Sequence, residues 1–393
     1  MYPNLYYAFK DLFGVDLGFL KMIQSFGFFV ALAFLFGSYF FSRELQRKEK
    51  EGLLKPHGIK VLKGQKATVS DLVINGLMGF VIGYKLVYVG FHFNQFLENT
   101  QAYLLSVKGS FFGGIVCALL FVYFKHREKE KEKLDEPKWV EETVHPYQLV
   151  GNMTLIAAVS GILGAKIFHN LENLDDFFAD PVGSLFSFSG LTMYGGLICG
   201  AIAVIYYANK KGLKTTHVID ASACGLMLAY GVGRIGCQVA GDGDWGIDNH
   251  FPKPGWMSFL PDWFWGYTYP HNVNGVGVPI PGCEGSHYCN VLENPVFPTP
   301  LYESLVCIGL FFVLWSIRKK VTTPGVFFCI YLVLNGIERF WIEKIRINTL
   351  YHIFGHGITQ AEIISTLLFF LGIIGIWYFK KGVQSSKFKV QSS

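Results

Sequence analysis

Long apolar segments are the feature that most constrains how this chain can fold. A membrane helix needs roughly 20 mostly apolar residues. Only 16% of the residues are charged, whereas ordinary soluble domains carry about 25%. We therefore predict an all-α polytopic membrane protein and exclude a disordered chain, a collagen, a nucleic-acid-binding protein and an ordinary cytosolic enzyme. The nine candidate spans are 22–42, 70–91, 109–124, 147–168, 187–208, 217–236, 301–317, 324–343 and 361–379.

Basic residues predict the orientation of these spans. Five alternate loops hold 24 of the 34 Lys and Arg residues, and cytoplasmic loops carry such an excess. The loops are 43–69, 125–146, 209–216, 318–323 and 380–393. We expect one integral membrane domain over 1–393 with its N-terminus outside and its C-terminus in the cytoplasm. Spans 217–236 and 324–343 are weaker because each carries charge.

The segment 237–300 differs from the rest of the chain. It holds nine of the 15 Pro residues and four Trp residues, so a long helix is disfavoured and contact with a membrane interface is favoured. We predict a small ordered head on the outer side. Cys283 and Cys289 share this polar loop, and both a disulfide and two free thiols stay open. The cysteine spacings predict no metal site.

Residues 70–127 resemble residues 150–210. Gly83-Tyr84-Lys85 corresponds to Gly164-Ala165-Lys166, and the Gly-Gly pair at 113–114 with Cys117 corresponds to 195–196 with Cys199. This predicts a repeated helix pair, a common feature of membrane folds, and the alternative is chance similarity between glycine-rich helices. The first copy lacks a counterpart of Tyr194, so we expect it to be structural.

Charged side chains near the bilayer are the main candidates for function. Arg339, Glu343 and Arg346 are spaced i, i+4 and i+7 and so share one helix face. Arg234 lies at the outer end of its own span. We expect the three arginines to converge near the outer leaflet with an excess of positive charge, where they would suit a phosphate group. The alternative is that they anchor helix ends at the interface.

Glycine-rich segments lie beside these charges. The two glycine-rich segments are 233–246 and 189–197, and a third motif, the Pro-containing start of a helix at 297–303, holds no glycine. Glycine lets a backbone approach a ligand closely.

The first of these segments resembles the signature of the prolipoprotein diacylglyceryl transferase family, Gly-Arg-x-Gly-Asn followed by Gly-Glu and Trp-Gly. Residues 233–236 match, Cys237 replaces the Asn, Asp242 stands for the Glu, and Trp245-Gly246 matches after one extra residue.

Three further motifs resemble the same family. Arg339-Phe340 with Glu343 and Arg346 matches its Arg-Phe-x-x-Glu-x-x-Arg, and 298–303 resembles its Pro-Ser-x-Leu-Tyr-Glu, with Phe297 in place of a preceding His. Residues 192–196 resemble Ser-Phe-His-Gly-Gly, with Tyr194 in place of the His. The resemblance covers about 17–45 and 147–380. Residues 46–146 then form an inserted basic loop, helix pair and charged linker, and removing that pair leaves the family's seven helices.

The resemblance implies a bacterial inner-membrane enzyme with its active site facing outward. It would transfer the diacylglyceryl group from phosphatidylglycerol to the lipobox cysteine of a prolipoprotein, the first step of lipoprotein maturation, forming a thioether and releasing glycerol 1-phosphate. The implied catalytic residues are Arg234, Arg339 and Tyr194, and no cofactor is implied. The implied substrate-binding residues are Arg234, Gly195, Gly196, Asp242, Gly246, Glu303, Glu343, Arg346, Lys166 and Asp220. We expect Glu303 and Tyr302 to brace an arginine, and Asp220 to be a buried partner of a polar group or of Lys166 rather than a catalytic group.

The base that activates the substrate thiol stays open. A tyrosine, with a pKa of about 10, is a poor base at neutral pH, so we interpret Tyr194 as a sign that an imidazole is not obligatory and that the arginines lower the pKa of the thiol. Glu343 is a second candidate acceptor, although an ion pair with Arg339 or Arg346 is the expected role. Two other functions stay open: a transporter or flippase of an anionic lipid or solute, and a sister enzyme that passes the group from phosphatidylglycerol to another acceptor.

Overall fold

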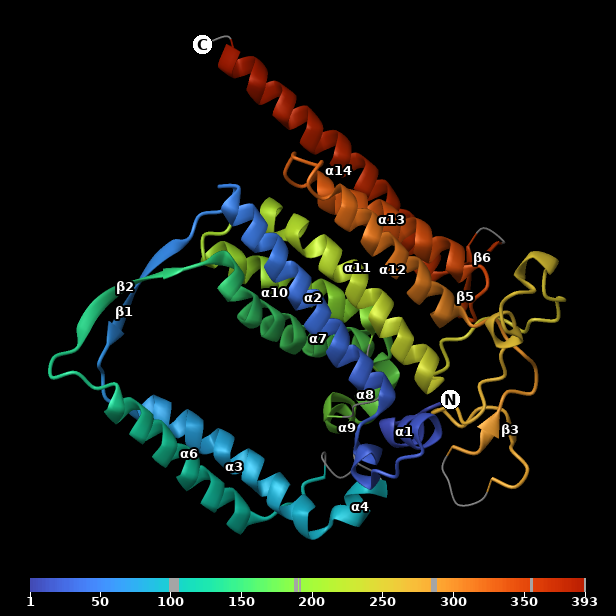
Figure 1. Ribbon diagram of the computed structural model, residues 1–393, viewed down its shortest axis with the longest axis horizontal. Helices are drawn as coiled ribbons and strands as arrows, with labels where there is room; N and C mark the ends of the chain where they lie inside the picture. The colour runs from blue at the N-terminus through green and yellow to red at the C-terminus, as the bar shows by residue number, and fades with distance from the viewer. Residues whose placement is uncertain (99–105, 187–189, 191, 284–287, 354–355, 392–393) are drawn as a thin grey trace. The chain divides into compact units, whose positions relative to one another are not determined.

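The computed structural model describes residues 1–98, 106–186, 190, 192–283, 288–353 and 356–391 (Figure 1). The chain divides into two compact units, which are treated separately below. Unit 1 comprises Met1–Pro3, Gln24–His57 and His145–Ser393, and unit 2 comprises Asn4–Ile23 and Gly58–Val144.

Each of the nine predicted spans overlaps a helix, and residues 187–189 and 191 of the span 187–208 lie outside the described residues. Within the described residues, six helical segments are long and apolar enough to cross a membrane by length and composition. They are 25–50, 69–91, 146–172, 215–240, 299–317 and 360–381. The multi-pass membrane prediction is thus confirmed, while the count of nine spans stays a prediction. The nine helices are α2 (Ser25–Lys50), α3 (Val69–Phe91), α6 (Phe111–Lys131), α7 (Val150–Glu172), α10 (Met193–Lys210), α11 (Thr215–Ala240), α12 (Thr299–Ile317), α13 (Val326–Glu343) and α14 (Gln360–Gln391).

Short elements join these helices. The sequence did not predict the three two-stranded sheets, β1 (His57–Lys63) with β2 (Lys138–Val144), β3 (Val278–Pro279) with β4 (Asn290–Val291), and β5 (Leu350–Ile353) with β6 (His356–Thr359). The last two pairs are antiparallel. The short helices are α1 (Leu5–Phe13), η1 (Gly18–Met22), α4 (Phe93–Glu98), η2 (Pro146–Leu149), α8 (Leu174–Ala179), α9 (Pro181–Phe186), η3 (Gly255–Met257) and η4 (Asp262–Phe264).

Helix α11 is the central helix of unit 1. In its most apolar window 61% of the residues are buried, against 17% in that of α2. Gly225 of α11 meets Gly37 of α2, where a Cβ would come 2.5 Å from the Gly37 carbonyl oxygen, so small residues let the two backbones approach. On another face Met227 and Cys224 pack with Cys307 and Phe311 of α12 in one buried cluster.

Ion pairs hold the end of unit 1 at which α11 begins. Glu44 of α2 binds Arg318 at 2.7 Å, and Lys48 lies 3.6 Å from Asp220. The Asp220 carboxylate also accepts 2.9 Å hydrogen bonds from the backbone N–H groups of Gly325 and Phe328, at the start of α13. These N–H groups lack partners within their own helix, so Asp220 acts here as a buried cap.

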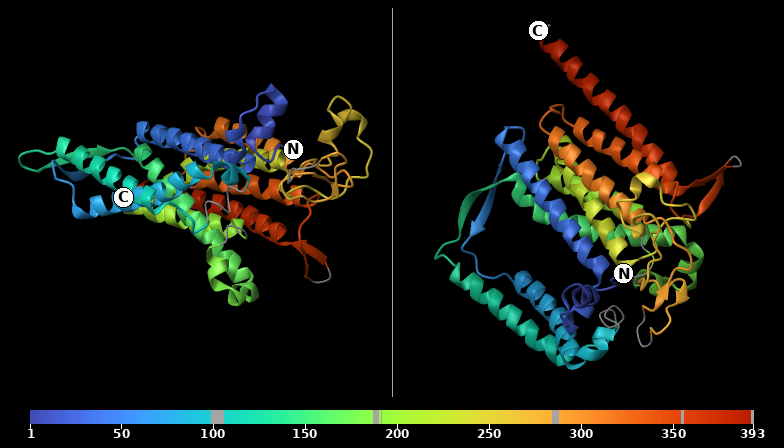
Figure 2. Two further views of the ribbon diagram at one scale, coloured as in Figure 1. Left: turned by 90° about the horizontal axis from the view of Figure 1, so that it is seen from below. Right: turned by 45° about the vertical axis from the view of Figure 1, so that its right-hand side comes forward.

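The opposite end of unit 1, at which α11 ends and α12 begins, is called the loop end. It carries the segment 241–298, drawn from yellow to orange (Figures 1 and 2). In this segment Trp245, Tyr269 and Val296 form a small core, and Cys283 and Cys289 form a disulfide with an S–S distance of 2.06 Å. The chain's amino group donates to the Pro270 carbonyl oxygen at 2.8 Å.

The repeated helix pairs pack in the same way. In unit 2 a Cβ on Gly83 of α3 would overlap Cys117 of α6, and in unit 1 a Cβ on Gly164 of α7 would overlap Cys199 of α10. A backbone hydrogen bond recurs as well, from Ser110 to Tyr84 at 2.8 Å and from Thr192 to Ala165 at 3.1 Å. The structure thus shows the similarity of 70–127 and 150–210 as a common packing geometry.

Candidate active site

Helix ends bring the predicted arginines together at the loop end. Arg234 lies six residues before the end of α11, and Arg339 lies near the end of α13. Glu303 lies in the first turns of α12, which begins at Thr299. Antiparallel packing therefore places the end of one helix beside the start of the next, and it converts three distant sequence motifs into one site.

Glu303 is the centre of the cluster, and its side chain is fully buried. One carboxylate oxygen accepts from Nε of Arg234, and Tyr230 donates to the same oxygen at 3.4 Å. The other oxygen accepts from Arg339 at 2.9 Å and from Arg346 at 3.0 Å. The expectation that Glu303 braces an arginine is confirmed, and it braces three. Tyr302 instead donates to the Phe264 carbonyl oxygen at 2.6 Å.

Asp244 is a second bridge, from the loop that follows α11. Its two carboxylate oxygens accept from Arg234 and Arg346. Burial opposes ionisation of this carboxyl, but the charges of Arg234 and then Arg346 outweigh burial and hold its pKa below the ordinary value. Glu343 binds Arg339 at 2.8 Å and accepts a hydrogen bond from Asn348.

These contacts correct the predicted charge of the site. The spacing of Arg339, Glu343 and Arg346 alone suggested excess positive charge, whereas the structure sets three carboxylates against three guanidinium groups. The two missing carboxylates, Glu303 and Asp244, come from other segments, so the spacing of one helix could not reveal them.

Backbone contacts fix the loop that carries Asp244. Gly246 donates to the Phe297 carbonyl oxygen at 2.8 Å and pairs with Arg346 in an isolated bridge. A Cβ on Gly246 would overlap the Ile345 carbonyl oxygen, so glycine is needed for this close approach. Asp242 accepts from the Asp244 N–H at 3.3 Å, and burial raises the pKa of the Asp242 carboxyl.

Three side chains near the arginines share the spacing of a metal site. Single donor atoms of Cys237, Asp242 and Asp244 lie within 4.8 Å of one another. Both oxygens of Asp244 already bind guanidinium groups. We therefore assign this group to the ion-pair network.

Glu338 is an acidic residue beside this network that the sequence reasoning missed. It lies on α13 with 7% of its surface exposed, and neither carboxylate oxygen has a hydrogen-bond partner among the described residues. Its electrostatic neighbours include Glu303 and Arg339. A further acidic residue in a largely apolar helix was the available signal.

Tyr194 and its glycines lie at the start of α10, against α7. A Cβ on Gly195 would overlap the Phe168 side chain, and one on Gly196 would lie 2.9 Å from the Gly161 carbonyl oxygen. These two glycines therefore serve helix packing and fix the position of the partly buried Tyr194.

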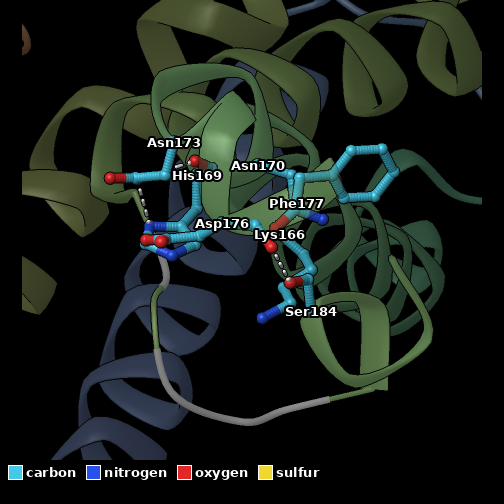
Figure 3. Close-up of a pocket in the computed structure, with 7 residues that line it drawn as sticks. All are labelled: Lys166, His169, Asn170, Asn173, Asp176, Phe177 and Ser184. Carbon is cyan, nitrogen blue, oxygen red and sulfur yellow. Dashed lines mark hydrogen bonds between the residues drawn. The ribbon is translucent and has the colours of Figure 1, made fainter. Parts of the chain in front are cut away.

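Lys166 lies near the loop end of α7, where it lines a small cavity (Figure 3). No residue of the arginine cluster is among the described residues that line this cavity. Asp220 is a buried partner of polar groups, as one of the two expectations held, but its partner is Lys48 at the other end of unit 1 and not Lys166. Asp220 precedes Arg234 by 14 residues on one helix, which is about 21 Å at 1.5 Å per residue.

Comparisons with known proteins agree with the motifs. A sequence model of the prolipoprotein diacylglyceryl transferase family matches residues 15–139 and 134–378. A phosphatidylglycerol–prolipoprotein diacylglyceryl transferase of Corynebacterium glutamicum is 28% identical over 240 residues, which cover 60% of this chain and 71% of the relative. Its counterpart in Clostridioides difficile is 30% identical over 232 residues, covering 58% of this chain and 78% of the relative. Because the family model spans most of the sequence, the chain belongs to the prolipoprotein diacylglyceryl transferase family.

Proposed function

We propose that this protein transfers the diacylglyceryl group of phosphatidylglycerol to the cysteine thiol of a prolipoprotein lipobox. The observation that carries the proposal is the convergence of Arg234, Arg339 and Arg346 on one buried carboxylate, Glu303. Guanidinium groups bind phosphate in two-pronged geometry. The names of the curated relatives describe the same substrates.

The chemistry is a substitution at carbon. The substrate sulfur attacks the glyceryl carbon that carries the phosphate ester, a carbon–sulfur bond forms, and the carbon–oxygen bond to phosphate breaks. Glycerol 1-phosphate leaves with the bonding electron pair, and the thiol proton passes to an acceptor or to the departing phosphate. Thiol and lipid supply every atom, so the step needs no cofactor.

The arginine cluster stabilises the charge that grows on the leaving phosphate. Each guanidinium has five N–H donors in a fixed fork, so Arg234 and Arg339 can bind phosphate while Glu303 still orients them. Preorganised donors aimed at developing charge are worth about 10²- to 10³-fold in rate for a single donor. Arg346, Glu343, Asp242 and Gly246 position this network.

The same arginines offer a way to activate the thiol where Tyr194 replaces the family's imidazole. A free cysteine has a pKa of about 8.5, and neighbouring cations lower it. In our proposal the cluster favours the thiolate, and Tyr194 donates a hydrogen bond to the phosphate. Glu343 remains the second candidate acceptor of the thiol proton, and its ion pair with Arg339 favours the positioning role.

We further propose that all nine helices cross the bacterial inner membrane with the loop end outside. The supporting observation is the excess of Lys and Arg in the loops at the other side. Secreted prolipoproteins present their lipobox on the outer side, so this orientation brings the thiol to the cluster.

The experiment is an adduct assay with the purified protein in detergent. Phosphatidylglycerol and a synthetic lipobox peptide are supplied, and mass spectrometry detects a diacylglyceryl group on the peptide cysteine. Arg234→Gln should lower the rate at least about 100-fold. Arg318→Gln is the matched control, because Arg318 also binds a buried glutamate but lies at the other end of unit 1; it should keep activity wherever it stays folded.

Two results would contradict the proposal. An Arg234→Gln variant with the wild-type rate would place the phosphate site elsewhere. No adduct from folded wild-type protein, across several peptides and lipids, would favour a lipid transporter or an enzyme with another acceptor.

A further inference from the structure

Glu338 is a buried acidic side chain to which the proposed function gives no role. It lies on α13 one residue before Arg339, and an α-helix turns by about 100° per residue, so the two side chains leave the helix in different directions. Neither carboxylate oxygen of Glu338 has a hydrogen-bond partner among the described residues. Buried polar groups are nearly always hydrogen-bonded, so this carboxyl group needs a physical explanation.

Three helices surround this carboxyl group. Helices α11, α12 and α13 pack against one another (Figure 1), and the groups that interact electrostatically with Glu338 lie on these helices or just after α13. They are Tyr230 and Arg234 of α11, Glu303 and Cys307 of α12, Tyr331 and Arg339 of α13, and Arg346. Among the charged groups Glu303 interacts most strongly. The dominant charge near Glu338 thus has the same sign as an ionised carboxylate.

Glu44 is the matched case of a buried glutamate that has partners. It lies on α2 and binds Arg318 at 2.7 Å and Arg47 at 2.8 Å. Glu338 is buried without such a partner, because the arginines of the cluster bind other carboxylates. An isolated carboxylate is so costly to take out of water that the group takes up a proton instead.

The charge of the arginine cluster leads to the same conclusion. Its three guanidinium groups are matched by the carboxylates of Glu303, Asp244 and Glu343. An ionised Glu338 would add a fourth negative charge and leave the cluster with an excess of negative charge. That excess would oppose the binding of a phosphate group, because charges inside a protein interact more strongly than in water.

We propose that Glu338 is a positioning residue, which holds a proton while the arginine cluster binds the phosphate of the lipid. It acts through Glu303, whose carboxylate orients all three arginines, and not by contact with the substrate. As an uncharged acid, Glu338 leaves the charge of the arginines available to the phosphate, and as a carboxylate it would cancel part of that charge. The inference rests on the proposed function, which assigns the phosphate to these arginines.

Binding of the lipid and protonation of Glu338 are then coupled, and such coupling is reciprocal. A phosphodiester keeps one negative charge over the whole pH range in which proteins stay folded, so any change of its affinity with pH comes from the protein. The affinity should be highest where Glu338 is protonated and should fall as the pH rises and Glu338 ionises. Where part of the free protein has an ionised Glu338, binding should take up protons from the buffer.

The first measurement detects the proton on Glu338 directly. Infrared difference spectra compare the wild type with Glu338→Gln, both as the full chain in phosphatidylcholine nanodiscs at neutral pH. The C=O stretching band of a protonated carboxylic acid is separate from the carboxylate bands, and the wild type should show such a band that Glu338→Gln lacks. The control Glu44→Gln should keep that band wherever it stays folded. Spectra of wild type and Glu338→Gln without this difference would overturn the proposal.

The second measurement follows binding rather than turnover. Short-chain phosphatidylglycerol is titrated by calorimetry into the same nanodiscs from about pH 6 to about pH 9, in buffers of different ionisation enthalpy, which count the protons taken up. In the wild type the dissociation constant should rise about tenfold or more over this range. Glu338→Gln is uncharged at every pH, so it should lose this rise and take up fewer protons, and Glu338→Asp should restore both. Glu44→Gln should behave as the wild type does.

Other titratable groups are separated from Glu338 by the same variants. Cys307, Tyr230 and Tyr331 face Glu338 and gain negative charge at high pH, and all three are still present in Glu338→Gln. A dependence on pH that survives unchanged in Glu338→Gln would belong to such groups and would overturn the proposal. Wild-type binding that is independent of pH, or wild-type protein that binds no phosphatidylglycerol, would overturn it without any variant.

The adduct assay decides the proposed function separately. Protein that forms the adduct but binds phosphatidylglycerol equally at every pH would keep the transferase and reject the role of Glu338. Protein that forms no adduct but takes up protons on binding through Glu338 would keep that role and reject the transferase. A purely structural role of Glu338 would lower the thermal stability of its variants without changing the number of protons taken up, and this result too would overturn the proposal.

Discussion

The two glycine-paired helix hairpins, α3–α6 and α7–α10, share a packing scheme and differ in their polar residues. Gly83 and Gly164 each face a cysteine of the partner helix. In return, Gly113 faces Val87 and Gly195 faces Phe168, which lie four residues after Gly83 and Gly164. Around this frame the second pair carries Tyr194, His169 and Asn170 where the first has Phe112, Tyr88 and Val89. Small residues thus set how the two helices pack, and the neighbouring positions can hold either polar or apolar side chains without changing that packing.

The largest expected effect comes from breaking the packing of each pair in turn. Gly164→Leu would force α7 and α10 apart, because even a Cβ overlaps Cys199 and the Gly195 backbone, and overpacking costs about 1–3 kcal/mol. Displacing Tyr194 and Lys166 by even ~1 Å should lower the adduct rate about 100-fold. Gly83→Leu should lower thermal stability similarly and keep most of the activity. Parallel loss of activity in both variants would show that the first pair has more than a structural role.

A smaller effect is expected from removing the hydroxyl group of Tyr194, which the first pair lacks because it has Phe112 at the corresponding position. If the arginines activate the thiol, Tyr194→Phe should slow the adduct assay less than about tenfold, whereas loss of an obligatory general base costs about 10²- to 10⁴-fold. The control is Phe112→Tyr, the reverse exchange at the corresponding position, which should leave the rate unchanged. A rate equal to wild type in Tyr194→Phe would remove Tyr194 from the mechanism, and a fall beyond 10²-fold would make it essential.

The sequence predicted the helices because hydropathy is a local property, and each of the nine apolar segments overlaps a helix among the described residues. It predicted that Arg234, Arg339 and Arg346 would converge, since all three lie near helix ends on one side. It did not predict which carboxylates balance them, because Asp244 and Arg346 are 102 residues apart and no periodicity connects them. The partner of Asp220 was missed for the same reason. The two-stranded sheets are too short to leave a pattern in the sequence.

The smallest expected effect concerns how the second helix of each pair begins. Ser110 accepts a hydrogen bond from the Gly113 N–H at 3.1 Å and so caps α6, whereas Thr192 at the corresponding position makes no side-chain cap and instead donates to Glu172 at 2.8 Å.

Loss of a serine cap costs typically about 1 kcal/mol, roughly a fivefold change in a local opening equilibrium. Hydrogen exchange should therefore speed up about fivefold at the Gly113 amide in Ser110→Ala. Thr192→Ala should leave exchange at the Gly195 amide unchanged, because the threonine hydroxyl holds the loop to α7 and not the helix start. Equal acceleration in the two variants would show that both helices begin alike, and the contrast between the pairs would then have to come from other positions, such as Tyr194, His169 and Asn170.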